Sequence, residues 1–299
     1  MRSLAVLLIS GCSLCFQTSL RGDQAAASDD APVASPTDMR TLATEFFEWR
    51  RVQQPASGDD IPRVERPDGW VPDFSPAALE SYRARYQDYL NAVDGLDTRD
   101  WDVTSRVDAR VLRAAIQRVH WELDVLQSPH RNPLFYVQQT LGSLFELLIL
   151  SSPMGEQRAG NILVRLEQIP HTLQAARENL NRPVRPFAQA TINSLVDVEE
   201  RMSRLRRALA AEFPDAQQQR LRKSIAKAAK ALSDYSDWLQ GNLDGMQTGF
   251  ASGPRKYQWF LANVALIPHS PDELLEQGGQ AGYRAVSWEA VEQNRNHEL

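Results

Sequence analysis

Hydrophobic residues recur every three or four positions over most of the chain, as they do on one face of an amphipathic helix. The longest apolar run after the N-terminus covers residues 134–150, and Pro133 can occupy its first helical turn. Ser151-Ser152-Pro153 ends the run before the roughly 20 apolar residues of a membrane span have accumulated. We therefore expect a central core helix, with a buried face made of Leu134, Val137, Leu141, Leu144, Phe145 and Leu148.

The same spacing predicts further helices, whereas no alternating strand pattern of useful length is present. The expected helices cover about residues 38–50, 75–94, 104–126, 154–181, 192–213, 215–239, 257–267 and 270–296. Pro170 should kink or split the fourth of these, because proline lacks the N–H that an interior helical turn needs. The prediction is an all-α fold, a multi-helix bundle of roughly eight helices without a sheet.

The N-terminus, residues 1–27, is typical of an export signal. Arg2 supplies a positive charge, and residues 4–9 form a short apolar segment. The four residues ending at Cys12 resemble a bacterial lipobox, in which the cysteine is lipidated and becomes the mature N-terminus. Alternatively, an ordinary signal peptide is cleaved near residues 25–27. We favour the lipoprotein, and both routes export the protein to the periplasm or its membrane.

The rest of the chain divides into a flexible tether over 28–38, rich in Ala, Ser, Asp and Pro, and a helical domain over 39–299. The hydrophobic content of 42% and the charged content of 24% are ordinary for a globular protein. The formal net charge of −5 argues against a general nucleic-acid binder, because phosphate neutralisation needs a basic surface. Membrane contact is expected only through the N-terminal signal or lipid anchor.

Motifs for catalysis and metal binding are absent from the sequence. Both cysteines, Cys12 and Cys15, lie in the export segment, so no cysteine remains for a metal site or a nucleophile. No two of the five histidines are three to five residues apart, and His297-Glu298 is only the start of an H-E-x-x-H pattern. We assign no catalytic, cofactor-binding or metal-binding residue, and Cys12 is the single candidate for modification.

Basic residues cluster on two successive predicted helices. If these helices pack antiparallel, a basic ridge that suits an anionic lipid surface or ligand would form, although we favour a solvated face balanced by acids elsewhere. The residues concerned are Arg201, Arg204, Arg206 and Arg207 on one helix and Arg220, Arg222, Lys223, Lys227 and Lys230 on the next.

Several spaced segments resemble the family called domain of unknown function 885. The likeness covers roughly residues 40 to 299, and its segments keep the same order as in the family. They are residues 131–137 (RNPLFYV), 165–170 (RLEQIP), 176–180 (ARENL), 238–239 (WL), 253–261 (GPRKYQWFL), 264–268 (VALIP), 287–290 (SWEA) and 294–296 (NRN).

This resemblance implies an exported bacterial protein, largely helical and similar to zinc metallopeptidases of the gluzincin type. Family members are about twice this length, and their H-E-x-x-x-H zinc motif lies in a C-terminal half that has no counterpart here. Residues 294–296 match a segment well before that motif, so His297-Glu298 is not the zinc site on this alignment. No catalytic residue carries over, and zinc is implied only for the full-length family.

Two hypotheses follow. In the first, the chain is the N-terminal helical half of a metallopeptidase-like protein, inactive alone, and its partner is the missing C-terminal half. In the alternative, it is a non-enzymatic helical lipoprotein that binds a peptide or protein partner in the periplasm. A continuation with H-E-x-x-x-H in the genomic DNA past codon 299 would favour the first. Because no cap closes the apolar helix 270–296, we also expect its open face to cause self-association.

The substitution Cys12→Ser tests the lipoprotein interpretation. It should release the protein from membranes into the soluble periplasmic fraction, because the tether carries no other apolar anchor. Membrane fractionation followed by immunoblotting measures this. An unchanged distribution, or a mature N-terminus near Ser28, would reject lipidation.

Overall fold

The computed structural model describes residues 35–56, 66–149 and 153–297 of the chain. The predicted export segment with Cys12 lies outside these residues. The tether was expected to reach residue 38, but the first helix already begins at Pro36. Ser35 and Asp38 form a capping box there: the Ser35 N–H donates to the Asp38 carboxylate at 2.7 Å, and the Asp38 N–H donates to the Ser35 hydroxyl at 3.3 Å.

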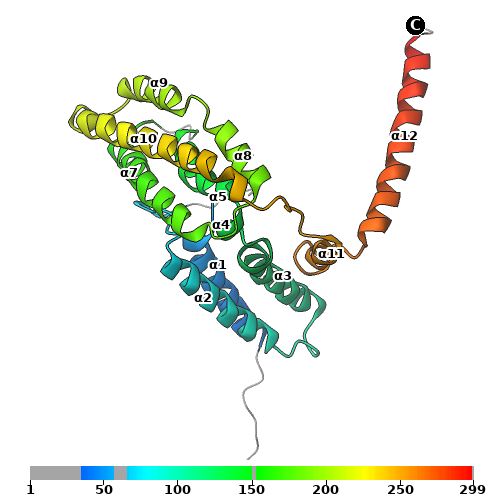
Figure 1. The fold of residues 1–299 in the computed structure, drawn as a ribbon. Helices are drawn as coiled ribbons and strands as arrows, with labels where there is room; N and C mark the ends of the chain where they lie inside the picture. The colour runs from blue at the N-terminus through cyan, green and yellow to red at the C-terminus, as the bar shows by residue number, and fades with distance from the viewer. Residues whose placement is uncertain (1–34, 57–65, 150–152, 298–299) are drawn as a thin grey trace, which may run out of the picture. The chain divides into compact units, whose positions relative to one another are not determined.

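The all-α prediction is confirmed, with more segments than the roughly eight expected (Figure 1). The α-helices are α1 (Pro36–Gln53), α2 (Pro76–Asp94), α3 (Val103–His120), α4 (Ser128–Arg131), α5 (Pro133–Val137), α6 (Ser143–Leu148), α7 (Glu156–Asn179), α8 (Arg185–Ser194), α9 (Val198–Ala210), α10 (Gln218–Asn242), α11 (Pro254–Asn263) and α12 (Pro271–His297). Four shorter segments are η1 (Trp121–Leu126) and η2 (Gln138–Gly142), which are π-helical, and η3 (Asp215–Gln217) and η4 (Leu243–Gly245), which are 3-10 turns.

The only β-type pairing among the described residues is an isolated bridge between Val184 and Gln247. Its hydrogen bonds run from the Arg185 N–H to the Gln247 carbonyl at 2.7 Å and from the Gln247 N–H to the Pro183 carbonyl at 3.1 Å. None of the described helices combines the length and the apolar character needed to cross a membrane.

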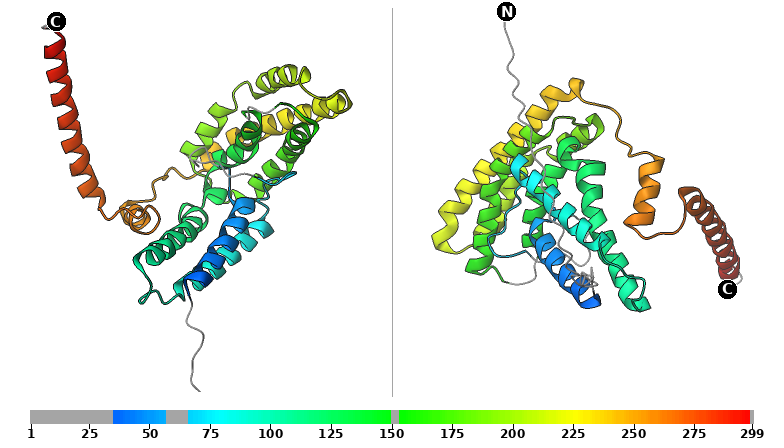
Figure 2. Two further views of the ribbon diagram at one scale, coloured as in Figure 1. Left: turned by 180° about the vertical axis from the view of Figure 1, so that it is seen from behind. Right: turned by 90° about the horizontal axis from the view of Figure 1, so that it is seen from below.

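The core centres on the pair α7 and α10, with α8 and α9 packed against α10 and the shorter α5 and α6 against α7 (Figures 1 and 2). The two long helices run parallel, because Glu167 in the middle of α7 contacts Arg220 at the start of α10, and Arg177 near the end of α7 contacts Asp234 farther along α10. Pro170 lies inside α7 without splitting it. The fully buried apolar residues of the pair include Ile162, Leu163, Leu166, Leu221, Leu232, Tyr235 and Leu239.

The segment expected to be a helix is helical, as α5, η2 and α6 in succession, but its π-helical part changes the buried face from the prediction. Leu144 is 2% exposed as expected, but Phe145 is 55% exposed. A π-helical turn holds one more residue than an α-turn and so rotates the residues after it by about 100°. Gln139 and Thr140 within the π-helical segment are buried, and the Gln139 side chain bonds both the N–H and the carbonyl of Ala56, at 2.7 and 3.1 Å.

The long helix expected over 192–213 is divided into α8 and α9. Asp197 between them has φ of 54°, the left-handed conformation, in which an α-helix cannot continue. Leu195 and Val198 on either side of the break are both buried, so the chain turns around a point that is anchored in the core. The helix expected from residue 270 forms as α12 and is capped by Ser270, whose hydroxyl accepts a hydrogen bond from the Glu273 N–H at 3.2 Å.

Neighbouring residues Leu144 and Phe145 provide a test of the π-helical register. Leu144→Ala should lower the free energy of unfolding by about 2–5 kcal/mol, because it leaves a cavity in the core. Phe145→Ala should lower it by less than about 1 kcal/mol, because the ring is largely exposed. Urea denaturation of both variants measures the difference. Equal losses would show that α6 follows the uninterrupted α-helical register.

Candidate functional site

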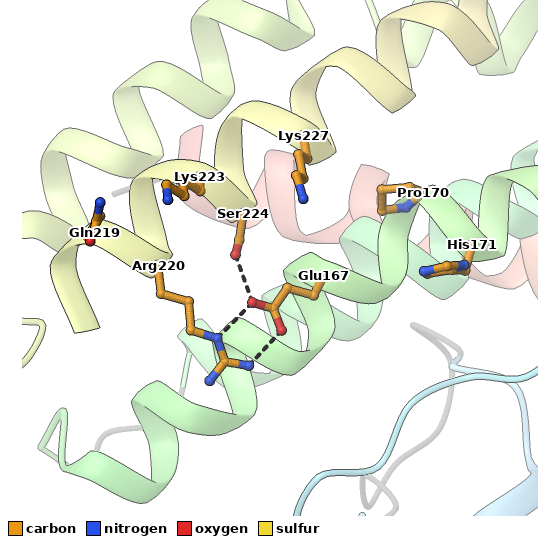
Figure 3. Close-up of a pocket in the computed structure, with 8 residues that line it drawn as sticks. All are labelled: Glu167, Pro170, His171, Gln219, Arg220, Lys223, Ser224 and Lys227. Carbon is orange, nitrogen blue, oxygen red and sulfur yellow. Dashed lines mark hydrogen bonds and ion pairs between the residues drawn. The ribbon is translucent and has the colours of Figure 1, made fainter. Parts of the chain in front are cut away.

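A hollow of about 600 Å³ lies between α7 and α10 (Figure 3). Arg220, Ser224 and Lys227 follow one another at spacings of three and four residues, so they share one face of α10. Helical geometry thus brings the cationic side chains of one helix to the same side of the hollow. Its lining residues are Glu167, Pro170 and His171 of α7 and Gln219, Arg220, Lys223, Ser224 and Lys227 of α10.

Glu167 is held across the middle of this hollow. Arg220 donates from Nε to Oε1 at 2.7 Å and from Nη2 to Oε2 at 2.6 Å, and the Ser224 hydroxyl donates to Oε1 at 3.1 Å. The hydrogen bonds from Arg220 are the largest cause of a lowered pKa of Glu167; burial opposes them, and Ser224 and the charge of Lys227 add to the lowering. Glu167 is therefore ionised at neutral pH. No local signal reveals this pair, because 53 residues separate its members.

The basic residues of α9 and α10, for which a solvated face balanced by acids was favoured over a basic ridge, are only partly balanced by acids. Arg204 and Arg207 approach Glu200 at 3.9 and 3.3 Å, and Lys230 pairs with Asp234 at 2.8 Å. Lys223 and Lys227, in contrast, make no ion pair within the described part of the chain, and both line the hollow. Arg206 of α9 also makes no ion pair within the described residues, so unpaired basic side chains remain on both helices, and those that line the hollow are Lys223 and Lys227.

A second polar cluster joins α2 to the end of α3. The Asp124 carboxylate accepts hydrogen bonds from the Tyr86 hydroxyl and, at 2.8 Å, from Arg83 Nε. Its Oδ2 also lies 3.1 Å from Nδ1 of His120. Asp124 sits in the π-helical segment η1, and such segments occur often at functional sites. The spacing of the histidines alone does not reveal this cluster. The four-residue spacing of His120 and Asp124 could have indicated it, because residues four apart share one face of a helix.

Aromatic side chains of α11 cover this cluster. The Trp259 ring lies 5.5 Å from the His120 ring, and Phe260 and Trp259 lie 4.9 and 6.3 Å from Trp121. The contacts tie α11 to the end of α3, so we interpret the cluster as an anchor between helices.

Arg165 of α7 is a buried cation. Its Nε and Nη1 atoms are buried and make no hydrogen bond, and its guanidinium lies 4.0 Å from the centre of the Trp70 ring. Burial lowers the pKa of Arg165 to about 10, and the charge of Arg66 over the same ring contributes. These nitrogens expose almost no surface, so Arg165 packs α7 against the segment before α2 and offers nothing to a ligand.

Among the described residues no group of three or more His, Cys, Asp or Glu side chains could hold a metal ion. These side chains do not fit the zinc ion that the resemblance implies for the full-length family, and no chemical step through zinc follows from them. His130 bonds the Asn179 carbonyl at 3.0 Å, and His120 belongs to the cluster with Asp124. The assignment of no catalytic, cofactor-binding or metal residue stays a prediction, and Cys12 lies outside the described residues.

Residues 55–287 match the model of a family described as "Bacterial protein of unknown function (DUF885)". The match covers more than half of the chain. The chain belongs to this family. This match confirms the resemblance at the level of the family. The matched residues include both the hollow between α7 and α10 and most of α12. No curated protein matches the chain.

One solved structure with the same fold is described as that of a candidate lipoprotein of unknown function from Shewanella oneidensis. The TM-score is 0.65 at 15% sequence identity, and the match covers 84% of this chain and 46% of the other. At this identity the likeness shows the fold alone. The chain spans under half the length of that structure.

The cluster around Asp124 predicts a dependence of stability on pH. Burial alone raises the pKa of Asp124, but hydrogen bonds from Tyr86 and Arg83 outweigh it and leave the pKa below its ordinary value. The stabilisation is therefore present above the unfolded-state pKa of about 3.9 and is lost as pH falls through the folded-state pKa. In the variant Asp124→Asn, the free energy of unfolding should therefore fall less steeply as the pH is lowered (the acid limb of the stability curve) than in the unmodified protein.

The control is Asp88→Asn on the exposed side of α2, which should leave the acid limb as it is in the unmodified protein. Urea denaturation at a series of pH values gives both curves. If Asp124→Asn and the unmodified protein lose stability in parallel, Asp124 does not stabilise the fold through its charge.

Proposed function

We propose that this chain provides a helical scaffold of a larger exported, peptidase-like protein, and that α12 receives the remaining helical portion. The observation that carries this proposal is the exposure of α12. Leu275, Tyr283 and Val286 are 77%, 79% and 65% exposed. Of the described side chains of α12, only Pro271 and Leu274 near its start are even partly covered.

The exposed face of α12 has the pattern of a buried one. Leu275, Gly279, Gly282 and Val286 recur at spacings of three and four and so lie on one side of the helix. Exposed apolar residues at helical spacing favour contact with another apolar surface. A partner with its own apolar helix would bury this face as a helix–helix contact.

The glycines of α12 support the same conclusion. Glycine inside a helix is less stable than alanine by about 0.5–1 kcal/mol, and a mostly exposed helix gains little from packing to offset this. A Cβ atom added at Gly278, Gly279 or Gly282 would meet nothing within 4 Å. Nothing in the described fold therefore requires glycine at these positions, whereas a closely packed partner helix would.

The peptidase-like part of the proposal rests on the resemblance and on the length of the similar structure. That structure is more than twice as long as the portion that this chain matches. In the proposed complete protein the remaining portion supplies any zinc ligands, and the present residues supply the scaffold. Export follows from the N-terminal pattern, and the lipoprotein description of the structural neighbour supports it.

Paired substitutions on α12 test this proposal. The double variant Leu275→Ser/Val286→Ser should reduce both self-association and binding of a hydrophobic dye by the native protein, because it removes the exposed apolar face. Light scattering after size-exclusion chromatography and dye fluorescence measure the two effects. The matched control is Gln280→Ser/Arg284→Ser, which changes the polar side of the same helix and should alter neither.

Two results obtained with the unmodified protein would contradict the proposed function. A monodisperse, dye-silent monomer with a cooperative melt would show that the face of α12 needs no partner. Hydrolysis of a peptide mixture by the purified chain with added zinc would overturn the assignment of the chain to the scaffold.

A further inference from the structure

We propose that the hollow between α7 and α10 is a binding site for a phosphate group. The phosphate-binding side chains are Lys223 and Lys227, beside Arg220, which is held by Glu167. It does not involve α12, so it is independent of the scaffold proposed above.

The charges of the hollow favour a dianion. Three cationic side chains and one carboxylate line it, which leaves an excess of two positive charges on a chain whose formal net charge is −5. Like charges on one helix repel each other, and Lys223 and Lys227 are one turn apart. An anion between them relieves that repulsion, whereas within the described residues no carboxylate forms an ion pair with either lysine.

The available donors favour phosphate over a carboxylate. A guanidinium recognises a carboxylate through a two-pronged contact, and Glu167 already occupies that face of Arg220 at 2.7 and 2.6 Å. The remaining donors are two ammonium groups, which act as point charges and are common phosphate ligands. Lys227 extends from α10 toward α7 on the side of the hollow where His171 and Pro170 lie (Figure 3).

The hollow is built into the core and does not depend on a mobile surface. Ile162 and Leu166 of α7 and Leu221, Ile225 and Ala228 of α10 are fully or almost fully buried. Packing of the two helices therefore fixes their backbones relative to each other, and the α-helical repeat fixes the spacing of Lys223 and Lys227 along α10. A volume of about 600 Å³ leaves room for a phosphate group and for part of the molecule that carries it.

Two sources of phosphate fit this site, a soluble phosphate compound and the headgroup of an anionic phospholipid. Calorimetric titration with inorganic phosphate and with pyrophosphate examines the first source. Co-sedimentation with phosphatidylglycerol vesicles, and with phosphatidylcholine vesicles as the uncharged comparison, examines the second. Both assays use the full chain at low ionic strength, where exposed charges are least screened.

The double variant Lys223→Gln/Lys227→Gln should bind the phosphate probe about tenfold more weakly, as expected for the loss of two exposed charge contacts. The matched control Arg222→Gln/Lys230→Gln removes the same charge from the same helix outside the hollow and should change affinity less than about twofold. Equal weakening in both variants would show general attraction to a basic helix and overturn the site.

Glu167→Gln gives a test of opposite sign. It removes the negative charge and weakens the hold on Arg220, so phosphate binding should become several-fold tighter, whereas a residue of purely structural importance would only lower the melting temperature. No phosphate binding by the unmodified protein in either assay overturns the proposal. So does binding of an acidic peptide that pyrophosphate does not displace.

Discussion

The structure depends on the parallel packing of α7 and α10. Ile162 and Leu166 of α7 and Leu232 of α10 have no exposed surface, and the shorter helices are arranged around this pair. Two buried polar side chains of this pair bond to backbone carbonyls of neighbouring segments, which restricts how those neighbours can pack. The Tyr235 hydroxyl donates to the Pro133 carbonyl at 3.1 Å, and Asn179 donates to the Phe74 carbonyl at 2.6 Å. These bonds connect the core pair to α5 and to the segment before α2.

Local chemistry made the ends of several helices predictable, and long-range packing explains the failures. Ser75 and Pro76 start α2, and Ser270 caps α12, because capping side chains act within one turn. The π-helical turn at η2 depends instead on Gln139 reaching the backbone of Ala56, which lies 83 residues away. The left-handed Asp197 is equally invisible to periodicity, because the apolar spacing continues across it.

The candidate site, too, was predictable where it depends on local spacing and unpredictable where it depends on long-range packing. The four-residue spacings of basic residues on α10 are local, so the sequence showed that these cations share a face. The helix that completes the hollow was not predictable: α9 does pack against α10, as considered, but the hollow is formed with α7, through Glu167. Charge balance on a surface depends on which helices become neighbours, and a single sequence does not contain that information.

The hollow between α7 and α10 and the apolar face of α12 differ in what stabilises them. The hollow between α7 and α10 is formed by helices that bury each other, so it exists whether or not anything binds there. Helix α12 contains three glycines and little packing to offset their conformational entropy, so a partner on its apolar face would stabilise it. A partner that covers α12 would rigidify that helix without altering the distance between α7 and α10. The proposed ligand binding in the hollow and the proposed assembly through α12 would therefore be physically separable.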